Sequence, residues 1–186
     1  MVKTFDRLDP SIARNGKDLR SSKHGAHVGG LIARGQMIGW REWVSLPELG
    51  IERIKAKVDT GARTSSLHAV DIRPFERDGV EWVSFVAKPH TGGAMDRLEV
   101  PCEASVIGFR PVRSSSGFAE HRYFVMTPMV IGNKRFDIEV TLTNRAEMGF
   151  EMLFGRSALR RGRFVVHPSH SYLQGQVSRP AQRFEK

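Results

Sequence analysis

The sequence predicts an all-β domain, and three features of the chain support this fold class. Between residues 135 and 142, apolar and polar side chains alternate, which is the pattern of a half-buried β-strand. Several other segments rich in Val, Ile, Phe and Trp follow one another at short spacing. Turn residues such as Gly79 and Gly132-Asn133 separate these segments, and almost no segment shows a helical repeat. Together these features favour a β-barrel or a β-sandwich.

The same patterns predict each element in order. We expect strands over residues 38–46, 51–59, 66–73, 80–88, 98–107, 121–131, 135–142 and 163–167, and one short helix over 156–161. Residues 1–36 lack a sustained period and contain scattered glycines, so we expect a disordered basic N-terminal extension there. The folded domain is expected over 37–175, and a flexible basic tail over 176–186.

The net charge of +9 lies at the two ends of the 186-residue chain. Residues 1–36 carry seven basic and three acidic side chains, and residues 160–186 carry six and one. The remainder, residues 37–159, carries sixteen of each sign. The ends are therefore either solvated tails that keep the protein soluble or a weak electrostatic contact for RNA, the ribosome or another polyanion.

The composition excludes several classes of protein. No stretch approaches the roughly 20 apolar residues that a membrane span needs. The first residues contain no apolar run, so no secretory signal is expected. Cys102 is the single cysteine, which excludes an intrachain disulfide and a cysteine-based zinc site. These features favour a reducing, cytoplasmic location.

One motif indicates a chemistry, because Asp59-Thr60-Gly61-Ala62 directly follows the apolar-basic strand 54–58. A strand that ends in this tetrapeptide is typical of aspartic proteases, in which two neighbouring carboxyl groups share one proton. One group activates water and the other protonates the substrate carbonyl oxygen. Thr60 offers a hydroxyl that can bind a partner copy of the loop, and Gly61 leaves room for a close backbone approach. The alternative interpretation is an ordinary Asp-Gly turn after a strand.

The motif occurs once in the chain, with no second Asp-Thr-Gly or Asp-Ser-Gly. A catalytic pair therefore requires either a homodimer, with Asp59 from each chain on the two-fold axis, or a second acid of another kind. Asp71, Asp96 and Asp137 are the candidates within the chain.

The similarity extends beyond the motif. The segments IGWREWV at 38–44, KAKVDTGARTS at 55–65, LTNR at 142–145 and MLFGRSAL at 152–159 together resemble a narrower family. This is the bacterial retropepsin-like family that bears the name ATP-dependent zinc protease, and the resemblance covers residues 37–175. It implies a closed acid-protease barrel with one short helix. It also implies a functional link to ATP-grasp glutamate ligases of the RimK type, with which family members are often found.

The resemblance implies site residues as well. Asp59, Thr60 and Gly61 would form the catalytic loop, and Lys57, Ala62, Arg63 and Arg145 would bind substrate. Lys57 occupies a position that lines a substrate subsite in retropepsins, and Arg63 stands where many of them carry an acid. Two cations there suit an anionic substrate such as a Glu-rich or glutamylated protein tail.

Two alternatives concern the basic residues of this region. Lys55 and Lys57 can equally be solvated residues of a strand. Arg156, in the 152–159 segment, is expected to make a structural ion pair beneath the barrel rather than to bind substrate.

The family name implies zinc and ATP, but the chain lacks the motifs for either. It contains no His-Glu-x-x-His helix and no Gly-x-x-x-x-Gly-Lys-Ser/Thr phosphate loop. The seven histidines are scattered at spacings that do not predict a shared metal site. We therefore expect that this chain itself uses neither zinc nor ATP, and that it binds no metal and no cofactor.

The sequence thus predicts an aspartic peptidase that hydrolyses a peptide or isopeptide bond in an acidic substrate, active as a homodimer. The alternative is a non-catalytic module that binds acidic peptides, or a ribosome-associated protein that uses its basic ends. In that case Lys57 and Arg63 would neutralise Asp59 and leave no acid for catalysis.

Overall fold

The computed structural model describes residues 35–89, 98–113, 117, 119–144 and 149–175. Contacts divide the chain into two units, Met1–Arg34 and Gly35–Lys186, and all described residues belong to the second. Residues 1–34 of the predicted extension over 1–36 fall outside the described residues. Gln36, which the prediction also assigned to the extension, belongs to a strand. The predicted tail over 176–186 falls outside them entirely.

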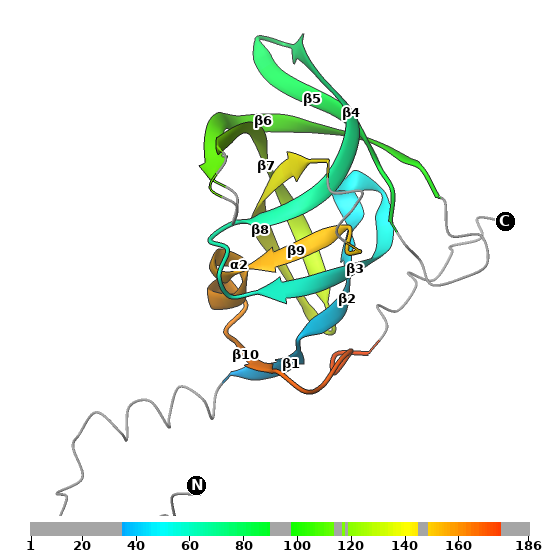
Figure 1. Ribbon diagram of the computed structural model, residues 1–186. Helices are drawn as coiled ribbons and strands as arrows, with labels where there is room; N and C mark the ends of the chain where they lie inside the picture. Colours follow the sequence, from blue (N-terminus) through cyan, green and yellow to red (C-terminus); the bar gives the residue numbers. More distant parts are fainter. Residues whose placement is uncertain (1–34, 90–97, 114–116, 118, 145–148, 176–186) are drawn as a thin grey trace, which may run out of the picture. The chain divides into compact units, whose positions relative to one another are not determined.

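The described residues form ten strands and one α-helix (Figure 1). In chain order the elements are β1 (Gln36–Gly39), β2 (Arg41–Leu46), the short 3-10 helix η2 (Pro47–Leu49), β3 (Ile51–Asp59), β4 (Ser65–Arg77), β5 (Val80–Ala87), β6 (Val100–Arg113), β7 (Ala119–Ile131), β8 (Lys134–Thr143), β9 (Met152–Gly155), α2 (Arg156–Arg161) and β10 (Phe164–His167). The predicted β-rich class with one short helix is confirmed. Among these residues no helix has the length and apolar character needed to cross a lipid bilayer.

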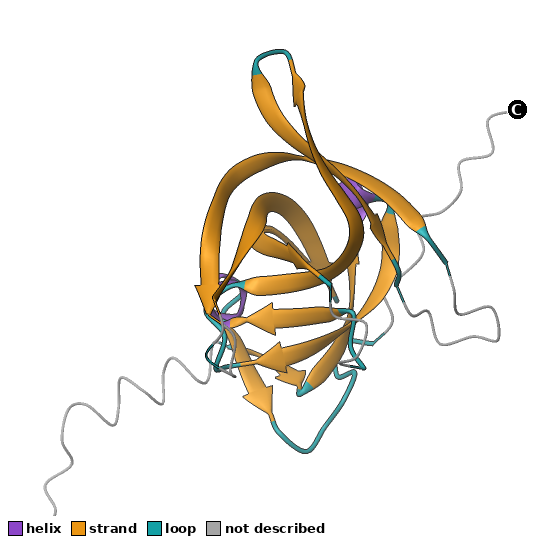
Figure 2. Cartoon of the chain, turned by 45° about the horizontal axis from the view of Figure 1, so that its top comes forward, coloured by secondary structure: helices purple, strands orange, loops and turns teal. Residues whose placement is uncertain are grey.

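Six of the strands pair in a ring. β2 pairs with β3, β3 with β9, β9 with β4, β4 with β8 and β8 with β7, and β7 returns to β2. Figure 2 shows the strands curving around a common interior. The β3–β9 and β4–β8 pairs are parallel, and the other four pairs in the ring are antiparallel. The β4–β5 hairpin projects beyond the ring at the top of Figure 1.

The ring encloses an apolar core. Its fully buried side chains include Val44, Ile54, Leu67, Val140 and Phe154, each from a different strand of the ring. On β8 the more buried Phe136, Ile138 and Val140 alternate with the less buried Arg135, Asp137 and Glu139, as the sequence pattern predicts, whereas all four residues from Val140 to Thr143 are buried. Burial of one face of each strand supplies the main driving force for closing the ring.

Two strands run further than the sequence predicts. The segments predicted over 66–73 and 98–107 become β4, which ends at Arg77, and β6, which ends at Arg113. Proline discourages a strand prediction because it lacks the amide donor of the ladder. Pro74 and Pro111 nevertheless fit, since at these positions each strand has a paired neighbour on one side only.

The first predicted strand, over 38–46, is divided at Trp40 into β1 and β2. β1 pairs in parallel with β10 in a separate two-stranded sheet, while β2 belongs to the ring. The chain after β10 returns along β1 and β2, where Trp40 N–H donates to His170 O and Tyr172 N–H donates to Arg41 O, each at 2.9 Å.

The buried Glu42 holds this C-terminal segment in place. Its side chain is fully buried and accepts hydrogen bonds from three backbone amides. Gly39 N and Leu173 N lie 2.6 and 2.8 Å from Oε1, and Gln174 N lies 3.2 Å from Oε2. Tyr172 then stacks on Trp43 with ring centroids 5.4 Å apart. These contacts join the end of the domain to its first two strands.

Candidate active site

The Asp59 loop begins where β3 ends. β3 lies in parallel beside β9, and this register places Asp59 opposite Gly155. The β3 residues Ile54 and Ala56 are fully buried, so the strand is fixed in the core up to the loop. Asp59 itself is partly exposed, and Thr60 and Gly61 are exposed. A buried strand therefore presents a carboxylate to solvent on a short turn.

Two backbone amides orient the Asp59 carboxylate. Gly61 N–H and Ala62 N–H donate to Asp59 Oδ1 over 2.9 and 3.0 Å. A Cβ at Gly61 would lie 3.2 Å from the same oxygen, which is tighter than most Cβ contacts. The predicted close approach at Gly61 is thus present. Among the described residues Oδ2 has no hydrogen-bond partner, so one carboxylate oxygen is held and the other is available.

The Arg156 side chain holds the loop through hydrogen bonds to its backbone, whereas the sequence predicts an ion pair for this residue. Its guanidinium donates to the backbone carbonyls of Thr60 at 2.8 Å and Gly61 at 2.9 Å. In the described part of the chain it makes no ion pair with a carboxylate. The contacts of Arg156 in the described structure are thus with two carbonyl acceptors of the loop, and the expected ion pair remains a prediction.

The first turn of α2 completes this support. Arg156 N–H donates to Ala62 O and Ser157 N–H donates to Arg63 O, each at 2.9 Å. These are two of the helix N-terminal amides that have no partner inside the helix. Gly155 lies against the same loop, because a Cβ there would meet Thr64 C and O at 2.6 and 2.7 Å. Its amide donates to the buried Ser65 hydroxyl at 3.1 Å.

Three of the four predicted substrate-binding residues, Lys57, Ala62 and Arg63, lie in the Asp59 loop or next to it. Lys57 is exposed on β3, where its register partner is Arg41, and Arg63 is exposed after Ala62. Within the described residues no ion pair joins either cation to Asp59. Arg145 lies outside the described residues, so its predicted role in substrate binding remains a prediction. Lys55 is partly buried, with its ammonium 5.2 Å from the centroid of the Trp43 ring.

Glu139 is a further candidate that the sequence did not indicate. Thr64 Oγ1 donates to Glu139 Oε1 at 3.3 Å, and Arg110 donates to Glu139 Oε2, also at 3.3 Å. Glu139 thereby connects the Asp59 loop with the β6–β7 hairpin. The alternation in 135–142 places Glu139 on the face away from the core, but only the fold brings Thr64 and Arg110 to it.

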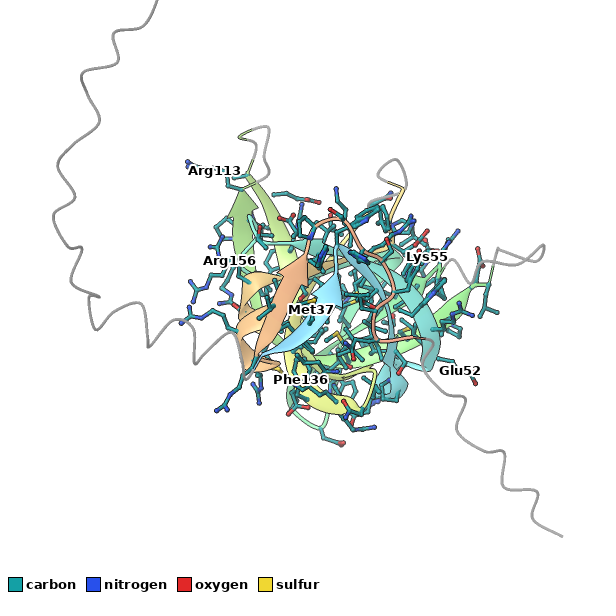
Figure 3. The ribbon with its side chains drawn as sticks, turned by 90° about the horizontal axis from the view of Figure 1, so that it is seen from below. Met37, Glu52, Lys55, Arg113, Phe136 and Arg156 are labelled. Atoms are coloured by element: carbon teal, nitrogen blue, oxygen red, sulfur yellow. The ribbon has the colours of Figure 1, made fainter. Side chains whose placement is uncertain are left out.

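The β6–β7 hairpin ends on the same side of the domain as α2. Figures 1 and 3 both place the end of β6 there, and Figure 3 labels Arg113 and Arg156 on one side with Lys55 on the other. The hairpin tip itself, over 114–116, falls outside the described residues. The arrangement puts a hairpin arm beside the Asp59 loop.

No second acid joins Asp59 within the described part of the chain. Asp71 has a positive φ of 53° and lines an open groove of about 550 Å³ on β4, β5 and β6 that includes no residue of the loop. Asp137 Oδ2 lies 4.0 Å from Arg161. Asp96 lies outside the described residues. Of the three candidate second acids, Asp71 therefore lies in a groove away from the loop, and Asp137 lies near Arg161.

Nucleophilic or metal-based alternatives have little support in the described residues. They contain no group of three or more His, Cys, Asp or Glu side chains placed to hold a metal ion. Burial raises the pKa of the Cys102 thiol from its ordinary 9.0 to about 11. The thiol donates to Leu49 O at 3.2 Å, so Cys102 is a packed core residue and a poor nucleophile.

Comparison with known proteins defines the class of this site. The family model that describes the RimB-like proteins, retropepsin-like aspartic endopeptidase RimB, matches residues 37–177. The chain therefore belongs to the RimB-like family of retropepsin-like proteins. The predicted family resemblance, made from the segments around Asp59 and Gly155, is confirmed.

Curated relatives carry a different name. Proteins called probable alpha-L-glutamate ligase are 48% identical over 145 residues in Desulfotalea psychrophila and 45% identical over 140 residues in Shewanella halifaxensis. These matches cover 77% and 75% of the chain but only 30% of each relative. The chain thus corresponds to less than a third of these longer proteins.

A solved structure has the same fold. The crystal structure of Lpg0085 from Legionella pneumophila, a protein of unknown function, matches with a TM-score of 0.60 and 28% identity. The match covers 74% of this chain and 97% of the Legionella chain. The two chains therefore share this fold over nearly the whole length of the Legionella chain.

Proposed function

We propose that this protein is an aspartic peptidase that hydrolyses a peptide or isopeptide bond in an acidic substrate, such as a Glu-rich or glutamylated protein tail. The observation that carries the proposal is the Asp59 carboxylate. One of its oxygens is held by the amides of Gly61 and Ala62, and it stands at the end of a buried strand in a chain of the retropepsin-like family. We interpret the ring of strands as the closed barrel of that fold, over residues 37–175.

The reaction requires a second carboxyl group. In the proposed homodimer, Asp59 of each chain lies on the two-fold axis, and the pair shares one proton. The ionised carboxylate removes a proton from water, whose oxygen attacks the scissile carbonyl carbon, while the protonated carboxyl gives its proton to the carbonyl oxygen. Collapse of the tetrahedral intermediate breaks the C–N bond: the carboxyl that took the proton from water gives it to the leaving nitrogen, and the other carboxylate takes a proton from a hydroxyl of the intermediate, which restores the pair with one shared proton. No metal or cofactor takes part in this scheme.

The surrounding cations support the choice of an acidic substrate. Lys57 and Arg63 are exposed beside the loop and are not paired with Asp59 in the described residues. They therefore leave the acid free and can meet carboxylates of the substrate. Arg145 is proposed to contribute a further cation, and Ala62 to contact the substrate backbone.

The names of the curated relatives support a functional link to a glutamate ligase. We propose that this chain acts on the glutamate residues that such a ligase adds, so that the two activities oppose each other. The lone buried Cys102 fits a reducing, cytoplasmic setting for both. The basic ends over 1–36 and 176–186 are proposed to make weak contacts with polyanions such as the ribosome.

Hydrolysis of a short poly-glutamate peptide tests the proposal. We would compare wild type with Asp59→Asn, with and without a chelator, from about pH 4 to pH 8. Cleavage that vanishes in Asp59→Asn and is unaffected by the chelator is the expected result. Equal peptide binding by both proteins without cleavage at any pH would indicate the binding module instead. Loss of RNA binding on deletion of residues 1–36, without any peptide cleavage, would indicate the ribosome-associated alternative.

A further inference from the structure

Three basic side chains form a row on the outer face of β3. Ile54 and Ala56 are fully buried in the core, so the alternation of the strand turns Arg53, Lys55 and Lys57 to the opposite face, where each is at least partly exposed. The row ends two residues before the proposed catalytic acid. Positive charge therefore leads along the strand towards the Asp59 loop.

The neighbouring strand β2 adds a fourth cation and an aromatic support. In the register of the two strands, Arg41 lies opposite Lys57 and Trp43 lies opposite Lys55. The guanidinium carbon of Arg53 lies 3.6 Å from the centroid of the Trp43 ring, and the Lys55 ammonium lies 5.2 Å from it. These cation–π contacts hold the two cations over the ring without using their hydrogen-bond donors.

In the described part of the chain, none of these four cations makes an ion pair with a carboxylate. Arg41 donates instead to the Ser171 hydroxyl at 3.1 Å. The Nε atom of Arg53 is buried without a hydrogen-bond partner, as is Oε2 of Glu151, the acid that precedes β9. The described residues therefore leave the charge of the four cations unbalanced.

Other cations on the described surface have carboxylates within 4.0 Å. They are Arg77, Lys88, Arg110, Arg122, Arg135 and Arg161. The placement of Arg41 and Lys57 is also unfavourable in itself, because like charges directly opposite each other on neighbouring strands repel. An anionic ligand on this face would supply the missing charge and relieve the repulsion.

An extended acidic peptide fits the spacing of the row. Residues two apart in a strand are about 6.6 Å apart, and an extended peptide places every second side chain on one side at the same interval. Alternate glutamates of such a peptide can therefore meet successive cations through charge-assisted hydrogen bonds. The path from Arg53 to Asp59 is about 20 Å long, so a peptide needs about six residues to reach both.

We propose that Arg53 and Lys55, with Arg41 and Lys57 beside them, form a docking surface for the acidic tail of the substrate. The surface holds glutamate residues that are remote from the scissile bond. This inference rests on the proposed function, because a tail docked here runs along β3 to the Asp59 loop. It follows that long acidic tails are preferred to short ones, since a short tail does not reach Arg53 from the loop.

Fluorescence anisotropy with labelled decaglutamate measures the docking. The full chain carries Asp59→Asn in this assay, so that binding is measured without hydrolysis. Adding Arg53→Gln/Lys55→Gln should weaken binding roughly tenfold or more. Arg73→Gln/Arg77→Gln is the matched control and should not weaken it. It removes the same charge, and Arg77 also lies over a tryptophan ring, 4.6 Å from its centroid.

Hydrolysis separates this inference from the proposed function. Wild type should cleave decaglutamate with roughly tenfold higher kcat/KM than triglutamate, whose extended length is about 10 Å. Arg53→Gln/Lys55→Gln should lose this preference and still cleave triglutamate. Equal cleavage of both peptides by wild type would contradict the docking surface and leave the peptidase. Cleavage of neither peptide, with decaglutamate binding that depends on Arg53 and Lys55, would contradict the peptidase and support the docking surface.

Two binding results would overturn the proposal. One is equal decaglutamate affinity with and without Arg53→Gln/Lys55→Gln. The other is tighter binding of a single-stranded RNA of the same charge that this variant abolishes, because the face would then bind nucleic acid.

A further measurement decides if the variant fails to fold. Carbodiimide joins peptide carboxylates to the lysine side chains that they contact, and it can be applied to the Asp59→Asn chain with its lysines intact. Amide bonds from decaglutamate to Lys55 or Lys57 are expected. Coupling confined to other lysines would contradict the docking surface.

Discussion

Truncation of Arg156 is the sharpest test of how the Asp59 loop is held. The guanidinium donates to the carbonyls of Thr60 at 2.8 Å and Gly61 at 2.9 Å, and these residues directly follow the acid. Arg156→Ala removes both bonds but leaves the backbone amide that donates to Ala62 O. Arg156→Lys keeps the charge but replaces the planar fork with a single ammonium group.

The expected loss follows from the two hydrogen bonds and their exposure. Bonds with a charged partner contribute about 1.5–3 kcal/mol each when shielded from water. Arg156 is exposed, so water can solvate the freed carbonyls, and we take about 1 kcal/mol per bond. The free energy of unfolding should fall by about 2 kcal/mol, which lowers Tm by roughly 4–8 °C for a chain of this size. Arg156→Lys should lose about half as much.

Thermal unfolding and peptide hydrolysis measure the effect, with Arg160→Ala as the control. Arg160 is exposed on the same helix, and among the described residues its side chain makes no hydrogen bond with the loop, in contrast to that of Arg156. The peptidase activity of Arg156→Ala should fall at least tenfold, because small displacements of a catalytic group are costly. If Arg156→Ala and Arg160→Ala unfold at the same temperature and retain equal activity, the carbonyl contacts do not support the loop and the reasoning fails.

Three further predictions concern burial and packing. Gly155→Ala should lower the free energy of unfolding by about 3 kcal/mol or more, because the new Cβ would meet the backbone of Thr64 and no change of rotamer can relieve this contact. Gly79→Ala is the control: nothing lies within 4 Å of its Cβ, so it should cost only about 1 kcal/mol. Chemical denaturation measures both variants. Glu42→Gln should lower stability by about 1–3 kcal/mol and raise the exposure of the stacked Trp43 to acrylamide, because one of three amide donors loses its acceptor. The pKa of Cys102 is raised to about 11, so the folded thiol keeps a proton that the unfolded one releases, and stability should fall between about pH 9 and pH 11 with a slope that Cys102→Ala reduces.

The sequence predicts those parts of the fold that depend on local pattern. The alternation over 135–142 became β8 with only small extensions, and the segments 51–59 and 156–161 agree with β3 and α2 to the residue. In each case the signal lies within the segment: a period of two residues, or a glycine followed by helix-forming residues. The division of 38–46 at Trp40 has no such signal, because it depends on where β10 and the return segment pair.

The candidate site is predictable only in part for the same reason. Asp59 and its loop are recognisable because the motif is contiguous in the chain. The partners of the loop are not, since Arg156 and Glu139 lie far from it in sequence and become neighbours through the parallel β3–β9 and β4–β8 pairs. Arg156 illustrates the same limit: its residue type predicts a hydrogen-bond donor, but the sequence does not say that the acceptors are the backbone carbonyls of Thr60 and Gly61.

The contacts of the loop bear on what a second chain would have to supply. The carboxylate is oriented by amides of its own turn. The carbonyls of the turn accept hydrogen bonds from the Arg156 side chain and from the first amides of α2. Next to the turn, the Gly155 amide donates to the Ser65 hydroxyl. All of these groups come from one chain, so the scaffold of the acid is complete without a partner. In the proposed homodimer the partner supplies the second carboxyl alone, and of the candidate acids within the chain the described Asp71 and Asp137 have other surroundings. Folding and catalysis should therefore have different requirements: a single chain is sufficient to build the loop, whereas the proposed chemistry needs two.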